Sequence, residues 1–302
     1  MRMKRFFCLL TLISLGLNLL GQSRLHFVDA VTGKPIPYVH VLFGENEGKY
    51  SDEDGFVTLP ENTQKARTSH ITYEPMELNV SELTDGAIAL TPVVTELRPA
   101  VVLPRDTKKL TIGYASKKGE SVRGGKNGSS IAEFFNYRQE WTHAPVVSAI
   151  SLNLNATNLK RHGTTVIDGE KYTDGVTHVA KLRIDLRSVD PVTGGPGQSL
   201  IEGGVIYSLK DRLTLNLHKR CKVTLPEPVV FPEDGVFVVV EWIVTDDVKP
   251  QDMVIPSIWR AQAGDGSTSW IKWPVGTPWK RVEKTPYDKG DKVFCISMEM
   301  QN

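Results

Sequence analysis

A period-two alternation of apolar and polar residues constrains this chain more than any other feature of its sequence. After Pro145, single polar residues separate apolar ones in three runs, at 150–154, 182–186 and 213–217. Successive side chains of a strand point to opposite faces, so this period predicts strands that bury one face of an antiparallel sheet. The second half of the chain is therefore expected to be all β.

Two further runs refine this expectation. Residues 236–240 are apolar throughout and follow a turn at 232–235, which predicts a central strand covered on both faces. The last run, 294–300, alternates again and is expected to return to the same sheet as 236–240. About eight strands within residues 131–302 predict a jelly-roll-like β-sandwich.

The first 22 residues have the pattern of a secretory signal peptide. Arg2, Lys4 and Arg5 precede an apolar run at 6–20, and cleavage is expected after Gly21 or Gln22. No lipid-acceptor cysteine follows the run. The alternative is an uncleaved anchor helix, which is disfavoured because Asn18 would lie in hydrocarbon. We expect an exported protein, in the periplasm, on the cell surface or secreted, with no transmembrane segment in the mature chain.

Residues 23–104 also predict strands, at 39–43, 56–59 and 87–90, separated by turns rich in Gly, Pro and Asp. Gly33 and Gly55 are expected at turn positions that need a positive φ. No helical period interrupts this region, so it predicts a first all-β domain.

The ordered segments 29–41, 52–59, 71–75 and 88–102 resemble the carboxypeptidase regulatory-like domain, a transthyretin-like β-sandwich of envelope proteins in Bacteroidetes-type bacteria. Segments 182–197 and 230–243 are similar to the uncharacterised C-terminal half of secreted proteins that carry this domain. The resemblance implies the pairing of domains and their export, and no reaction. It does not make the chain a zinc carboxypeptidase, because none of its 7 histidines begins the His-x-x-Glu pair that would bind the metal.

Residues 105–130 are rich in Lys, Gly and Ser and are expected to form a basic linker between the two domains. Ser130 and Glu133 have the spacing of a capping box, which predicts one short helix ending near Glu140. The C-terminal domain is then expected to span residues 131–302.

No catalytic template is present in the sequence. Neither Gly-x-Ser-x-Gly nor His-Glu-x-x-His occurs, and no cofactor, metal or catalytic residue is expected. A net charge of +1 gives no reason to expect nucleic acid as a partner. Glu241, beside Trp242, could be the acid of a sugar hydrolase, but a buried glutamate paired with an arginine or a backbone donor is favoured.

The strongest local anomaly is a cluster of four of the six tryptophans within residues 259–279. Indole rings on exposed loops offer flat apolar faces with a polar N–H, which suits sugars or partner side chains, whereas the alternative is that these rings cover the core. Trp270 and Trp273 are three residues apart, so on one strand they point to opposite faces. The candidate ligand-binding residues are Trp259, Trp270, Trp273, Trp279, Lys272, Lys280 and Arg281.

Two cysteines remain after the signal peptide, Cys221 and Cys295. In an exported protein they could form a disulfide, or each could serve as a small apolar strand residue. The function expected from all of these features is an exported, non-catalytic cell-envelope binding or accessory protein that recognises a glycan or another envelope protein. The alternative is a secreted, glycan-directed hydrolase without a linear catalytic motif.

Overall fold

The computed structural model of the chain describes residues 23–44, 47–83, 86–93, 108–114, 121–123, 128–141, 143–155, 165–167, 170–172, 178–208, 218–245, 253–262, 268–273, 277–283 and 292–302. The expected signal peptide at 1–22 and the alternating run at 213–217 lie outside these residues. Within the described part, all regular elements are strands except for a single 3-10 turn, and no helix could span a membrane. The expected all-β class is confirmed.

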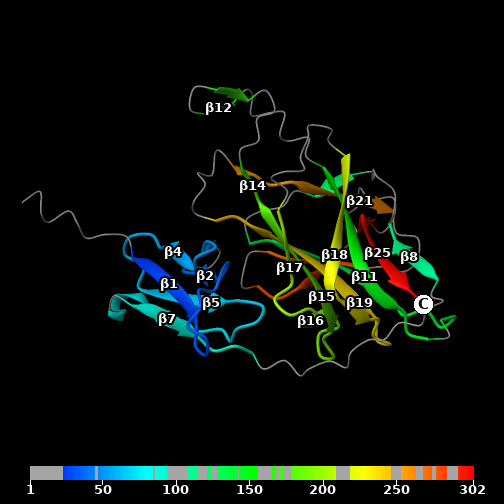
Figure 1. The fold of residues 1–302 in the computed structure, drawn as a ribbon, viewed down its shortest axis with the longest axis horizontal. Coiled ribbons are helices and arrows are strands. Elements are labelled where there is room, and N and C mark those ends of the chain that lie inside the picture. Colours follow the sequence, from blue (N-terminus) through cyan, green and yellow to red (C-terminus); the bar gives the residue numbers. More distant parts are fainter. Residues whose placement is uncertain are drawn as a thin grey trace, which may run out of the picture.

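The N-terminal domain is a β-sandwich of two small sheets (Figure 1). One sheet has the order β4-β1-β7 and the other β3-β2-β5-β6. Apolar side chains of both sheets, including Phe27, Val39, Val41 and Leu90, pack between them and are fully buried. The elements are β1 (Arg24–Asp29), β2 (His40–Leu42), β3 (Gly48–Tyr50), β4 (Phe56–Thr58), β5 (Lys65–Ser69), β6 (Glu77–Asn79), η1 (Val80–Glu82) and β7 (Ala87–Leu90).

The turns of this domain form as their residues predict. Asp29 Oδ1 accepts hydrogen bonds from the backbone N–H groups of Val31 and Thr32, and Asp52 Oδ1 accepts from those of Asp54 and Phe56. Gly55 has a φ of 79°, and a Cβ at this position would lie 2.6 Å from the carbonyl oxygen of Phe27. Only glycine satisfies both constraints.

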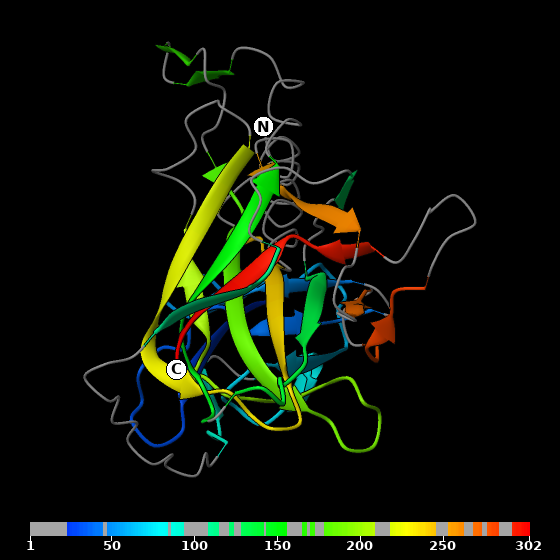
Figure 2. The same cartoon turned by 90° about the vertical axis from the view of Figure 1, so that its right-hand side faces the viewer.

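The C-terminal domain is a larger sandwich of two seven-stranded sheets. The first sheet, called here the proximal sheet, has the order β16-β15-β19-β10-β22-β23, with β17 also on β15. The second, the distal sheet, has the order β24-β21-β11-β25-β8, with β18 on β11 and β9 on β21. Figure 2, in which the right-hand side of Figure 1 faces the viewer, shows the distal sheet in front and the blue N-terminal domain behind it.

The strands of the C-terminal half follow one another closely along the chain. They are β8 (Lys109–Gly113), β9 (Ser121–Arg123), β10 (Ser130–Phe135), β11 (Val146–Asn155), β12 (Thr165–Ile167), β13 (Glu170–Tyr172), β14 (His178–Val179), β15 (Lys181–Val189), β16 (Pro196–Ser199), β17 (Val205–Tyr207), β18 (His218–Val230), β19 (Val236–Ile243), β20 (Met253–Val254), β21 (Ser257–Gln262), β22 (Thr268–Lys272), β23 (Lys280–Arg281), β24 (Lys292–Phe294) and β25 (Ile296–Gln301).

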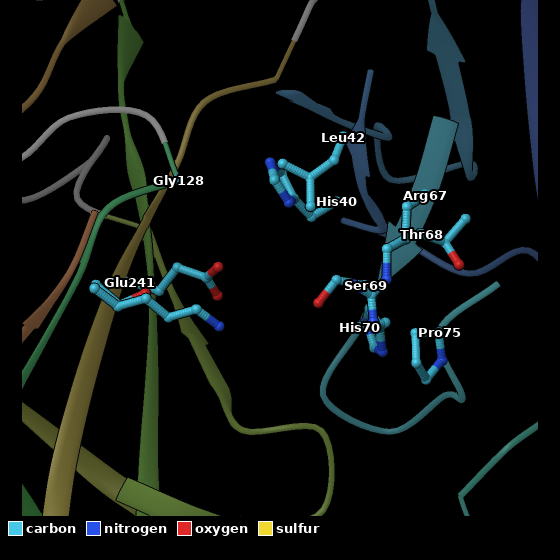
Figure 3. A pocket seen from close by; sticks show the side chains of 11 residues that line it. His40, Leu42, Arg67, Thr68, Ser69, His70, Pro75, Gly128 and Glu241 are labelled. Atoms are coloured by element: carbon cyan, nitrogen blue, oxygen red, sulfur yellow. The ribbon is translucent and has the colours of Figure 1, made fainter. Parts of the chain in front are cut away.

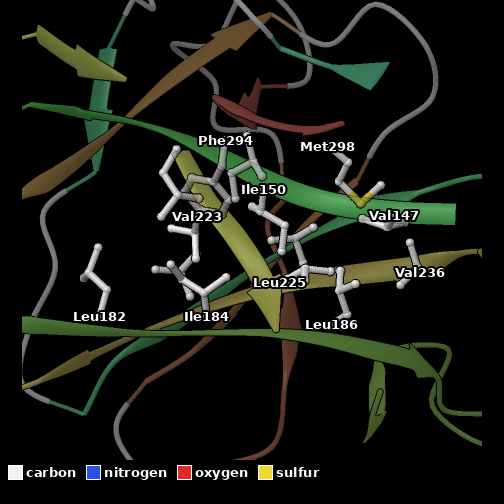
Figure 4. Packing of buried hydrophobic residues seen from close by; sticks show 14 of the residues in the cluster. Val147, Ile150, Leu182, Ile184, Leu186, Val223, Leu225, Val236, Phe294 and Met298 are labelled. Carbon is white, nitrogen blue, oxygen red and sulfur yellow. The ribbon is translucent and has the colours of Figure 1, made fainter. Parts of the chain in front are cut away.

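One core fills the space between the two sheets (Figure 4). Leu182, Ile184 and Leu186 of β15 face Ile150 of β11 and other distal-sheet residues across it. The polar residues between them point out of the sandwich, as the alternation predicts. Trp242 is the largest fully buried side chain, and its indole N–H donates to the carbonyl of Pro256 at 2.8 Å.

The predicted helix after Ser130 is wrong, because residues 130–135 form strand β10 in the middle of the proximal sheet. Glu133 does not cap a helix. Its carboxylate points between the sheets and accepts from the Ser269 hydroxyl at 2.5 Å and the Phe294 N–H at 2.9 Å. Pairing with β19 and β22 on both sides outweighs the local capping signal.

Two other expectations change in the structure. The stretch at 105–130 does not act only as a linker, because β8 pairs with β25 and β9 pairs with β21 in the distal sheet.

Strand β19 is central and buried on both faces, as predicted. The last strand, β25, joins the distal sheet and not that of β19, since alternation specifies which face is buried but not which sheet a strand enters.

Of the two alternatives for Cys221 and Cys295, the structure shows the second: no disulfide is formed, and both are buried thiols in or beside strands. The neighbours of β11 on its two sides are β18, which holds Cys221, and β25, which Cys295 immediately precedes. Two strand spacings are ~9.6 Å, beyond the ~7 Å that a disulfide spans between Cα atoms. The side chains also diverge, because Cys221 packs in the central core and Cys295 packs with Trp259.

We therefore expect two thiols per mature chain when the protein is unfolded without a reducing agent and titrated with a thiol reagent. Both should react far more slowly in the folded protein, because both side chains are almost fully buried. A sample reduced before unfolding provides the control and should give the same number. An unreduced sample that yields no thiols would contradict the arrangement of β18 and β25 around β11.

Candidate functional site

The N-terminal domain packs against the outer face of the proximal sheet, and this contact defines the site. One row of residues crosses four strands on that face: Arg183 of β15 lies opposite Glu241 of β19, which lies opposite Ser130 of β10, which lies opposite Lys272 of β22. These are the polar positions of the alternating pattern, so their side chains leave the sandwich core. They face the N-terminal domain, although Glu241 and Lys272 keep part of their surface exposed.

Glu241 is the centre of a hydrogen-bonded network between the domains. Its Oε1 accepts a hydrogen bond of 2.5 Å from the Tyr50 hydroxyl, and its Oε2 pairs with Arg183 Nη1 at 3.1 Å. Arg183 Nη2 donates to the backbone carbonyl of Tyr38 at 3.1 Å. Tyr38, Tyr50 and Ile243 form a small apolar cluster beside these groups. The favoured pairing of Glu241 with an arginine is confirmed, and its side chain is partly buried, with 20% of its surface exposed.

A second contact lies at the edge of the interface. Lys181 Nζ contacts both the Tyr38 hydroxyl and Glu53 Oε1 at 2.5 Å. Tyr38 itself has a φ of 59°, which is uncommon for a residue with a side chain and costs free energy. The interface holds this conformation, because the carbonyl and the hydroxyl of Tyr38 each bond to a basic residue of the C-terminal domain.

The charges of the network are fixed at neutral pH. Burial would raise the pKa of Glu241, but the charge of Arg183 and the hydrogen bond from Tyr50 outweigh it and hold that pKa below its ordinary value. Burial, together with the Glu241 charge, raises the pKa of Tyr50 well above its usual range. Glu241 is therefore an ionised acceptor and Tyr50 a neutral donor.

Beside this network, the two domains enclose a cavity of about 210 Å³ (Figure 3). Its walls come from the ends of β2 and β5 with the following loop on one side, and from β10, β19 and β22 on the other. The lining residues are His40, Leu42, Arg67, Thr68, Ser69, His70, Pro75, Gly128, Ser130, Glu241 and Lys272.

Two histidines line the cavity from the N-terminal side. His40 is 3% exposed, and burial lowers its pKa to about 4 although Glu241 opposes this. Burial and the nearby charge of Arg183 lower the pKa of His70 to about 3. His70 Nδ1 also accepts from the backbone N–H of Thr72 at 3.2 Å. Both rings are neutral at physiological pH.

The four candidate tryptophans do not form one surface. The prediction that Trp259 lies on an exposed loop is wrong. This residue lies on β21 of the distal sheet and is buried with Ala261 and Cys295. Trp270 and Trp279 pack from outside onto Phe237 and Val239 of the proximal sheet. The ring of Trp270 meets that of Phe237 edge-on, with centroids 6.1 Å apart.

Trp273 directly follows β22 and is 41% exposed, so one of the pair Trp270 and Trp273 is exposed, as the sequence predicts. Lys280 and Arg281 on β23 are exposed at the edge of the proximal sheet. Lys272 lies two residues after Trp270 on the same strand, so both face outward, and Lys272 reaches the cavity. The structure thus joins Trp270, Trp279 and Lys272 on one face.

Sequence reasoning did not identify the N-terminal residues of the site. Tyr50, His40, His70 and Arg67 occur in short strands or turns without a motif, and only the packing of the domains brings them to Glu241. Within the described residues, no group of three or more His, Cys, Asp or Glu side chains could hold a metal ion.

Replacing Glu241 by glutamine should lower the free energy of unfolding by about 3–5 kcal/mol, because Arg183 would keep a buried charge without its partner. Chemical denaturation of the mature chain measures this. Glu53→Gln is the matched control, since Glu53 also bridges the domains but is 73% exposed in its side chain, and its loss should cost less than about 1 kcal/mol. Equal, small effects of both changes would contradict the central role of Glu241.

His40 should make the protein less stable in acid. Its folded pKa of about 4 lies below the ordinary value, so the unfolded chain binds the proton first, and stability present above about pH 6.5 is lost as the pH falls toward 4. The contribution is roughly 3 kcal/mol. Denaturation at several pH values should show a flatter dependence for His40→Leu than for the unchanged protein. An unchanged slope would exclude His40 as a source of the acid sensitivity.

No protein-family model matches this sequence, and no curated protein matches it either. One solved structure is similar, the cysteine protease and lectin-like domains of Cwp84, a surface layer associated protein of Clostridium difficile. The identity is 13% and the TM-score 0.34, over 85% of this chain and 46% of that chain. A likeness this weak carries no argument about function, so the site must be interpreted from its own residues.

Proposed function

We propose that this protein is an exported, non-catalytic binding or accessory protein of the cell envelope, and that it recognises a glycan or another envelope protein on the outer face of its proximal sheet. Export rests on the signal-peptide pattern of residues 1–22. The N-terminal domain, which resembles carboxypeptidase regulatory-like domains, would act as a scaffold that covers one end of this face.

The observation that carries the proposal is the aromatic surface beside the cavity. Trp270, Trp279 and Phe134 are each partly exposed and lie on a buried base of Ala132, Phe237 and Val239. Partly exposed indole rings on a rigid sheet present flat apolar area next to polar groups, which suits the faces of sugar rings. This arrangement favours a glycan over a protein partner.

The chemistry of Glu241 supports a binding role over hydrolysis. A glycosidase needs a carboxylic acid that is still protonated near neutral pH to donate to the leaving group. Arg183 and Tyr50 act in the opposite direction and lower the pKa of Glu241. Both of its oxygens are also engaged, Oε1 by Tyr50 of the N-terminal domain and Oε2 by Arg183 of the same sheet.

A screen of soluble glycans and peptides against the mature chain tests the proposal. For any ligand found, Trp279→Ala should weaken binding about two- to tenfold while the melting temperature stays nearly unchanged. Trp259→Ala is the control, because its side chain is 7% exposed and its loss should cost ~3–5 kcal/mol of stability without a selective effect on binding. A ligand whose affinity is insensitive to Trp279 and Trp270 would contradict the assigned face.

The hydrolase alternative is tested on the same protein. A broad panel of glycan substrates should give no turnover. Turnover that is abolished by Glu241→Gln in a variant that still folds would replace the binding proposal by the hydrolase, since no other role of Glu241 predicts it.

A further inference from the structure

The cavity between the domains has an excess of positive charge. Among the described residues that line it, the only carboxylate is that of Glu241, which Arg183 already neutralises. Arg67 is 3.4 Å from Glu77, but both side chains are more than half exposed, so water screens this pair. Lys272 has no carboxylate within ion-pair distance among the residues that the structure describes.

The spacing of the sheet explains why Lys272 lacks a carboxylate. Ser130 lies between Lys272 and Glu241 in the row across the strands, so the backbones of the two charged residues are about 10 Å apart. Burial and the positive charges of Arg187 and Arg67 lower the pKa of Lys272, although the charge of Glu241 opposes this. Lys272 and Arg67 line the same cavity with like charges, and an anion bound between them would relieve their repulsion.

Neutral hydrogen-bonding groups complete the lining. The hydroxyls of Ser130 and Ser69 lie on opposite walls, one from each domain. His40 is almost fully buried, and its Nε2 has no hydrogen-bond partner in the described part of the chain. Figure 3 shows these groups of the N-terminal domain facing Glu241 across the open space. The His40 nitrogen is covered by Gly48, so the two hydroxyls are the neutral groups that can hydrogen-bond a polar ligand in the open space.

We propose that this cavity is a binding site for an anionic group, a carboxylate or a phosphate carried by a small ligand, with Lys272 and Arg67 as its cationic partners. This anion site is distinct from the aromatic surface of Trp279, so a negative result for one of the two proposals does not contradict the other. Because Lys272 belongs to the C-terminal domain and Arg67 to the N-terminal domain, a bound anion bridges the two and stabilises their contact.

The experiment measures the melting temperature and the heat of binding of the mature chain with three probes at one fixed salt concentration. The probes are glucuronate, inorganic phosphate and, as the neutral comparison, glucose. We expect saturable binding and a rise in melting temperature with glucuronate or phosphate and not with glucose, since a ligand that binds only the folded state stabilises it. A response to glucuronate alone identifies a carboxylate site, and a response to phosphate alone a phosphate site.

Lys272→Gln should weaken this binding about tenfold or more, the usual effect of losing a charge-assisted hydrogen bond. Lys280→Gln is the matched control, because it removes the same charge from the adjoining strand at an exposed position outside the cavity lining. In buffer without either anion, Lys272→Gln should be at least as stable as the unchanged protein, since it removes a repelled charge.

Three results would overturn the proposal. The first is the absence of saturable binding by both anions. The second is an equal loss in Lys280→Gln, which would indicate diffuse surface attraction. The third is a marked loss of stability in anion-free Lys272→Gln, which would show that Lys272 already has a structural partner. Arg67→Gln changes the opposite wall of the cavity and should also weaken anion binding. A loss in both variants assigns the binding to the cavity and not to another part of β22.

Discussion

The contact of Glu241 with Tyr50 and Arg183 is the interaction on which the rest of the site depends. Burial of a carboxylate is costly, and the cost is offset only if the charge is paired and its remaining lone pairs accept hydrogen bonds. Arg183 supplies the charge from the same sheet, while Tyr50 supplies the second bond from the other domain. The favourable state of Glu241 therefore requires the two sandwiches to be docked.

Docking in turn creates the cavity. When the Tyr50 hydroxyl is hydrogen-bonded to Glu241, the ends of β2 and β5 form the wall of the cavity opposite β10 and β22. His40 is buried and His70 partly buried there, and the pKa of each ring is lowered. Lys272 and Arg67 line this one cavity, and Lys272 has no carboxylate at ion-pair distance in the described residues. The same contact that neutralises one charge thus leaves another cation enclosed, which is the basis of the anion site that we propose.

The aromatic face has a different physical origin. The outer face of the proximal sheet carries three apolar residues, Phe237, Val239 and Ala132. The alternating pattern alone predicts polar, solvent-exposed residues at such positions. Trp270 and Trp279 cover them from outside and stay partly exposed. A sheet that is apolar on both faces needs such a cover, and a cover of indole rings leaves a surface suited to flat ligands.

Alternation and turn residues determined much of this protein from the sequence alone: the all-β class, the central strand at 236–240 and the turns at Asp29 and Gly55 each follow from local geometry. Local signals were wrong where strand pairing determines the structure. The capping box at Ser130 lies in a central strand, and Trp259 lies on a strand of the distal sheet. Alternation also could not specify which sheet the final strand joins. The partners of Glu241 were undetermined for the same reason. Tyr50 is 191 residues away in sequence, and only the packing of one sandwich on the other brings its hydroxyl to the carboxylate.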